Sequence, residues 1–196
     1  TTRIGALQSN GAGGSPSALV AGWCLTIQFF LMNVFCVSET RIAPEWKHTL
    51  IENLFLEKGY VVISHNRPPG DFPCDPHTNS SGIIIGIKRS SPGGLTLPEK
   101  DEFGRAVAAC APLDDDLTLR IVGTYGPSAA MAPRFPSSRQ GTREERSTIA
   151  FTTRQMDLAF RKGWLCAILG DMNSFSSLAL DREGGDFILR NVSLAT

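Results

Sequence analysis

The chain has 196 residues, of which 42% are hydrophobic and 19% are charged, so its composition excludes a disordered protein and predicts one globular domain with a hydrophobic core. Its 19 basic residues balance its 19 acidic residues, so the net charge is zero. The net charge therefore gives no indication of a nucleic-acid partner. A local basic patch remains compatible with this balance.

The first segment, residues 3–9, alternates weakly between apolar and polar side chains and predicts a strand. A glycine-rich loop follows, in which Ser15 and Pro16 suit the N-cap and first position of a helix. This loop lacks the Gly-Lys-Ser/Thr ending of a phosphate-binding loop, so we do not interpret it as one.

Residues 18–37 contain no charged side chain and are long enough to cross a bilayer. The polar Gln28 and Asn33, and the change to β-forming residues at Val34, favour a different interpretation. We expect a buried helix over residues 18–32 and a central strand over residues 34–37, with no membrane span. Glu39 then follows this strand at its carboxyl end, where crevices form in α/β sheets.

The next helix is predicted over residues 44–58, and Gly59 is expected to end it. Its expected buried face consists of Trp46, Leu50, Ile51, Leu54 and Phe55. The segments that follow are predicted as a strand (60–64), a long loop (65–81), a strand (82–88), a loop (90–101), a strand (105–111) and an acidic turn (113–117). The three aspartates of that turn are interpreted as a solvated hairpin turn and not as a metal site.

Residues 117–125 alternate as a strand that ends at Tyr125. A helix over residues 142–162 is expected to bury Ile149, Met156 and Phe160 and to cross over to a further strand. That strand, residues 164–169, lies between two glycines and is expected to be fully buried.

Asp171 and Asn173 follow the last apolar strand and are two residues apart, so both side chains point to the same side of an extended segment. An acid and an amide at the end of a buried strand indicate a site. The alternative is an Asp-x-Asn turn after a core strand, because both residue types favour turns.

The five scattered cysteines have no Cys-x-x-Cys spacing, and the three histidines have no metal-ligand spacing. We interpret the cysteines as reduced thiols of the core in an intracellular protein.

Three motifs together resemble the endonuclease/exonuclease/phosphatase superfamily, and within it the endonuclease domain of non-LTR (LINE-like) retrotransposons. They are Ser38-Glu39-Thr40, Val122-Gly123-Thr124-Tyr125-Gly126-Pro127 and Leu169-Gly170-Asp171-Met172-Asn173. The opening segment, residues 4–11, resembles the first strand of the family, which ends in an asparagine motif. The resemblance implies an α/β fold of two packed mixed β-sheets flanked by helices in four layers, as one incomplete domain over residues 1–196.

The resemblance also implies roles for five residues. Glu39 resembles the ligand of a divalent cation, Mg²⁺ with Mn²⁺ as a substitute, and Asn10 resembles an asparagine near that cation. Asp171 resembles the residue that orients or deprotonates the attacking water. Asn173 resembles an amide that donates to the phosphoryl oxygens, and Tyr125 a hydroxyl that contacts the scissile phosphate.

The chain departs from the family in its last part. The family closes with a Ser-Asp-His motif, whereas this sequence has no Asp-His pair, and the residues after Asn173 are too few for the missing strands. We therefore expect a piece of a larger polyprotein or a decayed copy, with weak or no activity unless His65 or His77 replaces the missing histidine.

The function expected from the resemblance is metal-dependent phosphodiester hydrolysis by a DNA-nicking endonuclease. The same resemblance implies DNA as the partner, fusion to a reverse transcriptase and a nuclear location. Two alternatives stay open: a phosphatase or phospholipase of the same fold, and a non-catalytic remnant that acts as a binding module.

Overall fold

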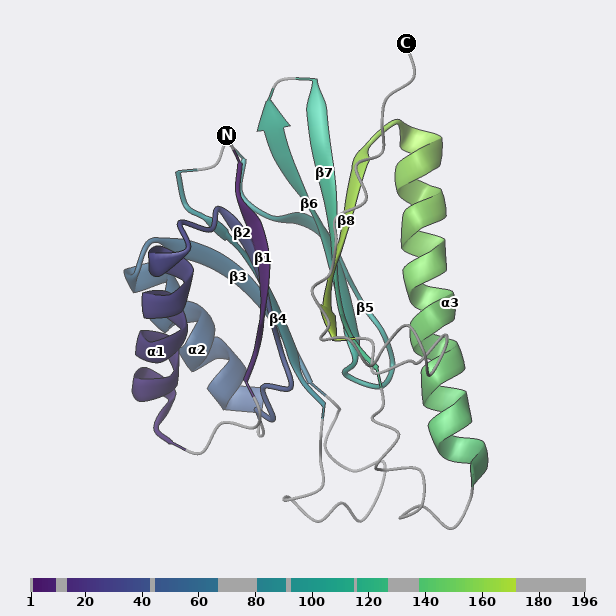
Figure 1. The fold of residues 1–196 in the computed structure, drawn as a ribbon, viewed down its shortest axis with the longest axis horizontal. Coiled ribbons are helices and arrows are strands. Elements are labelled where there is room, and N and C mark those ends of the chain that lie inside the picture. The colour runs from purple at the N-terminus through teal and green to yellow at the C-terminus, as the bar shows by residue number, and fades with distance from the viewer. Residues whose placement is uncertain are drawn as a thin grey trace, which may run out of the picture.

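Two four-stranded sheets pack face to face in the computed structural model, which describes residues 2–9, 14–42, 45–66, 81–90, 93–114, 116–126 and 138–171 (Figure 1). The strands are β1 (Ile4–Gln8), β2 (Val34–Ser38), β3 (Tyr60–His65), β4 (Ile83–Lys88), β5 (Thr96–Lys100), β6 (Ala106–Asp114), β7 (Leu117–Tyr125) and β8 (Leu165–Asp171). The helices are α1 (Pro16–Phe29), α2 (Glu45–Glu57) and α3 (Ser138–Lys162).

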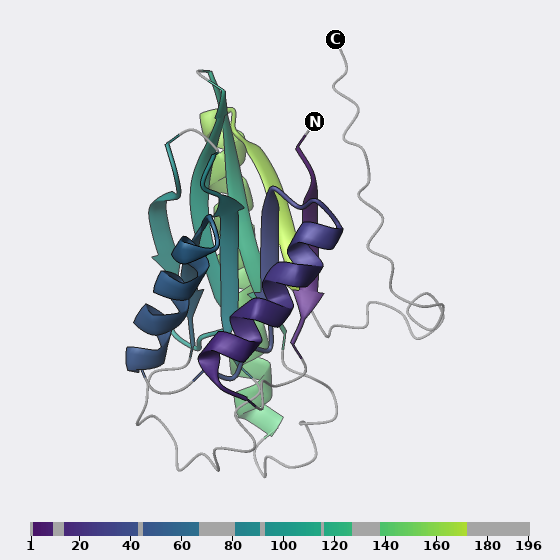
Figure 2. The same ribbon diagram turned by 90° about the vertical axis from the view of Figure 1, so that its left-hand side faces the viewer.

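The first sheet has the strand order β1-β2-β4-β3, and the second has the order β5-β6-β7-β8. β1 pairs in parallel with β2, and β7 pairs in parallel with β8, while the other neighbours are antiparallel. Helices α1 and α2 cover the outer face of the first sheet, and α3 covers the outer face of the second (Figures 1 and 2). The predicted four-layer fold class of two mixed sheets flanked by helices is therefore confirmed.

The core between the sheets consists mainly of small and β-branched side chains, which alternate along strands that have one face turned to the partner sheet. Gly123 of β7 allows close approach, because an added Cβ would lie 2.5 Å from Cγ2 of Ile85. Cys36 also lies in this core, and burial raises the pKa of its thiol to about 12. Cys24 and Cys110 are likewise buried thiols, whereas Cys166 is exposed.

Helix α1 begins as expected, because the Ser15 hydroxyl caps it by accepting from the Ala18 amide at 3.3 Å. The prediction of a buried helix over residues 18–32 is wrong in two respects. The helix ends at Phe29, and only one stripe is buried, while Leu25 and Phe29 are exposed. No helix within the described ranges is long and apolar enough to cross a membrane.

The predicted face of helix α2 is also partly wrong. Ile51 and Phe55 are buried, but Trp46 is 61% exposed and Leu50 is exposed as well. The helix rests on a narrow stripe because Phe55 packs between the rings of Trp23 and Phe35. This aromatic group fills the space between the two helices and the sheet.

The second sheet and its helix depart from several of the predictions. β5 lies within residues 90–101, which the sequence predicts as a loop, because its mostly exposed edge position produces no alternation. Helix α3 begins at Ser138 and not at residue 142. β8 is an edge strand whose first residues, Leu165 and Cys166, are exposed, so it is not fully buried as expected.

Helix α3 turns a different face to the sheet from the predicted one. Ile149, Met156 and Phe160 are exposed, with Phe160 at 88%. Over residues 146–162 of this helix, the buried side chains are Thr148, Phe151, Thr152, Gln155 and Ala159. This face is largely polar because it covers a buried arginine of the sheet.

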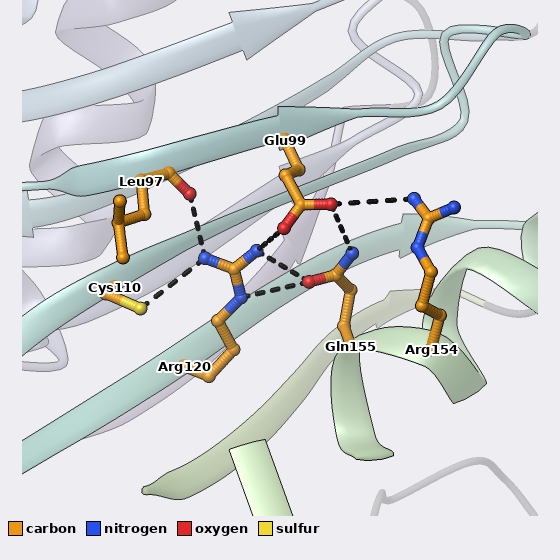
Figure 3. A network of polar contacts seen from close by, with 6 residues as sticks. All are labelled: Leu97, Glu99, Cys110, Arg120, Arg154 and Gln155. Atoms are coloured by element: carbon orange, nitrogen blue, oxygen red, sulfur yellow. Dashed lines mark hydrogen bonds and ion pairs between the residues drawn. The ribbon is translucent and has the colours of Figure 1, made fainter. Parts of the chain in front are cut away.

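That arginine is Arg120 of β7, which is 0% exposed (Figure 3). Its guanidinium donates to Oε1 of Glu99 at 2.7 Å, to the Leu97 carbonyl at 2.8 Å and to Oε1 of Gln155. Gln155 in turn donates to Oε2 of Glu99 at 2.9 Å. The contacts join β5, β7 and α3, so hydrogen bonds hold this helix in addition to the apolar packing of Phe151 against Ala106, Ala108 and Val122.

Candidate active site

One end of the sandwich collects polar residues from both sheets. The register pairs Gln8 with Ser38 and places Ile83, the start of β4, opposite both Ser38 and His65. In the second sheet, Tyr125 and Asp171 pair at the ends of the parallel strands β7 and β8. Hydrogen bonds between the sheets show that these ends meet, because Gln8 donates to Asp171 and Gly82 to the Gly104 carbonyl.

Gln8 connects the two predicted acidic residues of the site. Its Nε2 donates to Oε2 of Glu39 at 3.3 Å and to Oδ2 of Asp171 at 3.2 Å. Glu39 is 7% exposed, so its carboxylate is largely removed from water. The structure thus brings two carboxylates from different sheets to one carboxamide.

Glu39 lies in a strained turn at the end of β2. Both Glu39 and Arg41 have left-handed backbones, with φ of 57° and 49°, which costs about 1–2 kcal/mol per residue for side chains other than glycine. The turn is held because the Thr40 amide donates to the Gly82 carbonyl at 3.1 Å and the Arg41 amide to the Ser81 carbonyl at 3.0 Å. Within this turn, the Arg41 guanidinium forms an ion pair with Oε1 of Glu39.

Gly82 allows this turn to approach β4. Its φ of 108° is unfavourable for other residues, and an added Cβ would lie 2.5 Å from Oγ1 of Thr40. The strand before Asp171 has a similar requirement, because a Cβ on Gly170 would lie 1.9 Å from the Thr124 carbonyl oxygen. Gly170, with φ of 125°, is therefore essential where β8 meets β7.

Tyr125 pairs with Asp171 in the register, and the Gly126 amide donates to the Asp171 carbonyl at 2.7 Å. The Tyr125 side chain is buried in the core between the sheets, and the guanidinium carbon of Arg105 lies 5.7 Å from the centre of its ring. Contact of the Tyr125 hydroxyl with a phosphate stays a prediction.

Asn10 and Asn173, the two predicted amides of the site, lie outside the described residues. His77 also lies outside them, whereas His65 is described. It ends β3 at the opposite edge of the sheet from β1, where its Nε2 lies 2.8 Å from the Asp101 carbonyl and 3.1 Å from Oδ1 of Asp101. His65 thus joins the sheets at the far edge and does not lie beside Glu39 and Asp171.

Gln8 and Arg41 are the residues that sequence reasoning missed. A signal existed for Gln8, because the sequence predicts a strand over residues 3–9 whose end faces the site. None existed for Arg41, because its contact with Glu39 depends on left-handed backbones.

The donor set fits a hard divalent cation in part. Carboxylates are the ligands that Mg²⁺ prefers, and it needs only one or two of them when water and phosphate complete its shell. Glu39 and Asp171 supply two that converge on one amide nitrogen. Among the residues that the structure describes, no group of three or more acidic, histidine or cysteine side chains could hold a metal ion.

The architecture is that of the endonuclease/exonuclease/phosphatase fold. Solved structures with this arrangement include truncated Caenorhabditis elegans TDP2, which is 11% identical with a TM-score of 0.52 over 88% of this chain and 62% of that chain. D. rerio TDP2 complexed with a single-strand DNA product is 12% identical with a TM-score of 0.50 over 89% of this chain and 61% of that chain.

An AP endonuclease from Archaeoglobus fulgidus is 14% identical with a TM-score of 0.50 over 88% of this chain and 58% of that chain. The chain thus spans less than two thirds of the length of these structures. No protein-family model matches the sequence, and no curated protein matches it. The likeness therefore lies in the fold.

Proposed function

We propose that this end of the sandwich is the metal-binding part of a phosphodiester-hydrolysing site that nicks DNA for a retroelement. The observation that carries the proposal is the convergence of Glu39 and Asp171 on the Gln8 carboxamide. These two carboxylates come from different sheets and belong to two motifs that the sequence identifies independently.

Glu39, with Asp171 beside it, would hold the divalent cation. When bound, the cation supplies charge stabilisation for a phosphoryl oxygen and lowers the pKa of a bound water. Asp171 orients the attacking water or accepts its proton, because its strand ends at this edge. Tyr125, Asn173 and Asn10 complete the proposed site around the phosphate.

DNA is the proposed substrate for three reasons. The motifs resemble DNA-nicking retroelement endonucleases, and one similar fold is that of a TDP2 complexed with a single-strand DNA product. Arg41, whose side chain is 35% exposed, also places positive charge at this end beside Glu39. Fusion to a reverse transcriptase and a nuclear location are part of the same proposal.

The hydrolytic activity of this chain should be low. It has no Asp-His pair, and a general acid or base contributes roughly 10²–10⁴-fold to a rate. In Mg²⁺, we expect supercoiled plasmid to be nicked no faster than by the Asp171→Ala variant. Nicking that the substitution abolishes would show that another residue replaces the histidine.

Binding of DNA tests the proposal without requiring turnover. Fluorescence anisotropy of a labelled duplex should show tighter binding in Mg²⁺ than in EDTA, and Glu39→Gln and Asp171→Asn should remove this difference. Glu57→Gln and Asp157→Asn change exposed acids on α2 and α3 in the same way and serve as matched controls. Metal-independent binding, or equal loss in the controls, would contradict the proposal.

A further inference from the structure

Both oxygens of the Glu39 carboxylate accept hydrogen bonds from side chains of this chain. Arg41 contacts Oε1, and Gln8 Nε2 donates to Oε2 at 3.3 Å. These contacts occupy one acceptor position on each oxygen, and the guanidinium also repels any metal ion that approaches the same carboxylate. We propose that Arg41 competes with the divalent cation for Glu39, so that the cation binds fully only when the guanidinium leaves this carboxylate.

The backbone of the turn places Glu39 and Arg41 near each other. Glu39 and Arg41 both have left-handed φ values, on either side of the fully buried Thr40. The amides of Thr40 and Arg41 are fixed to carbonyls of the segment that enters β4. The turn therefore fixes the backbones of both residues in positions from which the guanidinium reaches Glu39.

Arg41, and not Gln8, is the competitor because of charge and exposure. A guanidinium and a divalent cation repel each other when they share one carboxylate, whereas the neutral Gln8 can rotate its carboxamide and present oxygen instead of nitrogen. The Arg41 side chain is 35% exposed, so it can move into water. Glu39 cannot follow it, because its side chain is only 9% exposed.

This inference rests on the proposed function and adds its regulation. The contact keeps the buried carboxylate paired when no cation is present, because an unpaired buried charge is costly. A substrate phosphate at this end would also attract the guanidinium, since arginine recognises phosphate well. Cation and phosphate together would therefore release Glu39 more readily than the cation alone.

The test measures Mn²⁺ binding directly by electron paramagnetic resonance, without DNA and without turnover. Arg41→Met removes the competing charge and keeps an unbranched side chain, and it should bind Mn²⁺ on the order of ten-fold more tightly than the unchanged protein. Arg41→Lys keeps the charge and should remain near the unchanged protein.

Arg89→Met removes an exposed positive charge beyond the other end of β4 and is the matched control. It should change the Mn²⁺ affinity by less than about two-fold, because β4 separates it from Glu39 by more than a Debye length at physiological salt. Circular dichroism checks that each variant is folded.

Glu39→Gln distinguishes the two proposals. If it weakens Mn²⁺ binding while Arg41→Met fails to strengthen it, the competition is overturned and the proposed metal site stands. If Glu39→Gln leaves Mn²⁺ binding unchanged, both are overturned. Tighter binding in Arg41→Met that Glu39→Gln reverses in the double variant supports both.

Discussion

The two outer layers of this sandwich attach to their sheets in different ways. Helices α1 and α2 pack through aromatic rings, with Phe55 5.7 Å from Phe35 and 6.1 Å from Trp23 between ring centres. Helix α3 instead covers the guanidinium of Arg120, which Gln155 and Glu99 hold by hydrogen bonds. The aromatic contacts are non-directional, whereas the hydrogen bonds of Arg120, which lie beside the apolar contact of Phe151 with the sheet, require one arrangement of donors and acceptors.

Phe55→Ala should give the largest loss of stability. Phe55 is fully buried among three aromatic rings, and truncating such a residue costs about 3–5 kcal/mol because the cavity closes only in part. Urea unfolding measures the change. The matched control is Phe160→Ala on α3, where the ring is exposed and the cost should stay within about 0.5 kcal/mol. Equal losses would refute the assignment of the faces.

Arg120→Ala should cost less, about 2–4 kcal/mol. The substitution leaves the Gln155 and Leu97 oxygens without their donor, while Glu99 is 40% exposed and can turn to water. The double variant Arg120→Met/Gln155→Met replaces buried polar groups by apolar ones. Urea unfolding should show that the double variant loses less free energy of unfolding than Arg120→Met and Gln155→Met lose in sum. Additive losses would contradict a coupled network.

A fall in pH should have the smallest effect on the free energy of unfolding, and it should act through His48 of helix α2. Burial first, and then Lys100 and His65, lower the pKa of His48 below its ordinary 6.5, although Glu52 opposes this. His48 Nδ1 lies 2.8 Å from the Ser64 hydroxyl, so the group joins α2 to β3.

The unfolded chain takes up a proton on His48 more readily than the folded chain does. The stability that neutral His48 provides is therefore complete above pH 6.5 and is lost as the pH falls below that value. Urea midpoints measured across this range should fall more steeply for the unchanged protein than for His48→Gln. Parallel curves would show that His48 does not contribute.

The sequence predicted most strands because their buried faces are apolar, and it placed Gly59 and Ser15 correctly at helix ends. It failed where hydrophobic periodicity does not report burial. On α3, the apolar Ile149 and Met156 face water, and the fully buried Gln155 is polar because its partner is the charged Arg120. A pattern of one helix cannot show which polar residue will have a buried partner on a distant strand.

The candidate site likewise contains residues that the sequence predicts and one that it does not. The sequence indicates Glu39, Tyr125 and Asp171 because each stands at a strand end, and the pairing of strands brings these ends together. The sequence does not indicate Arg41, because its contact with Glu39 depends on two left-handed residues that no local propensity favours. The roles of Glu39, Tyr125 and Asp171 stay predictions.

The central claim is that Glu39 and Asp171 bind one divalent cation together. A double-mutant cycle with Glu39→Gln and Asp171→Asn, in which Mn²⁺ affinity is measured by electron paramagnetic resonance, tests it most directly. We expect each single variant to bind more weakly and the two effects to differ from additivity by about 0.5–3 kcal/mol, as for residues in contact. Additive effects, or a single variant with unchanged Mn²⁺ affinity, would contradict the claim.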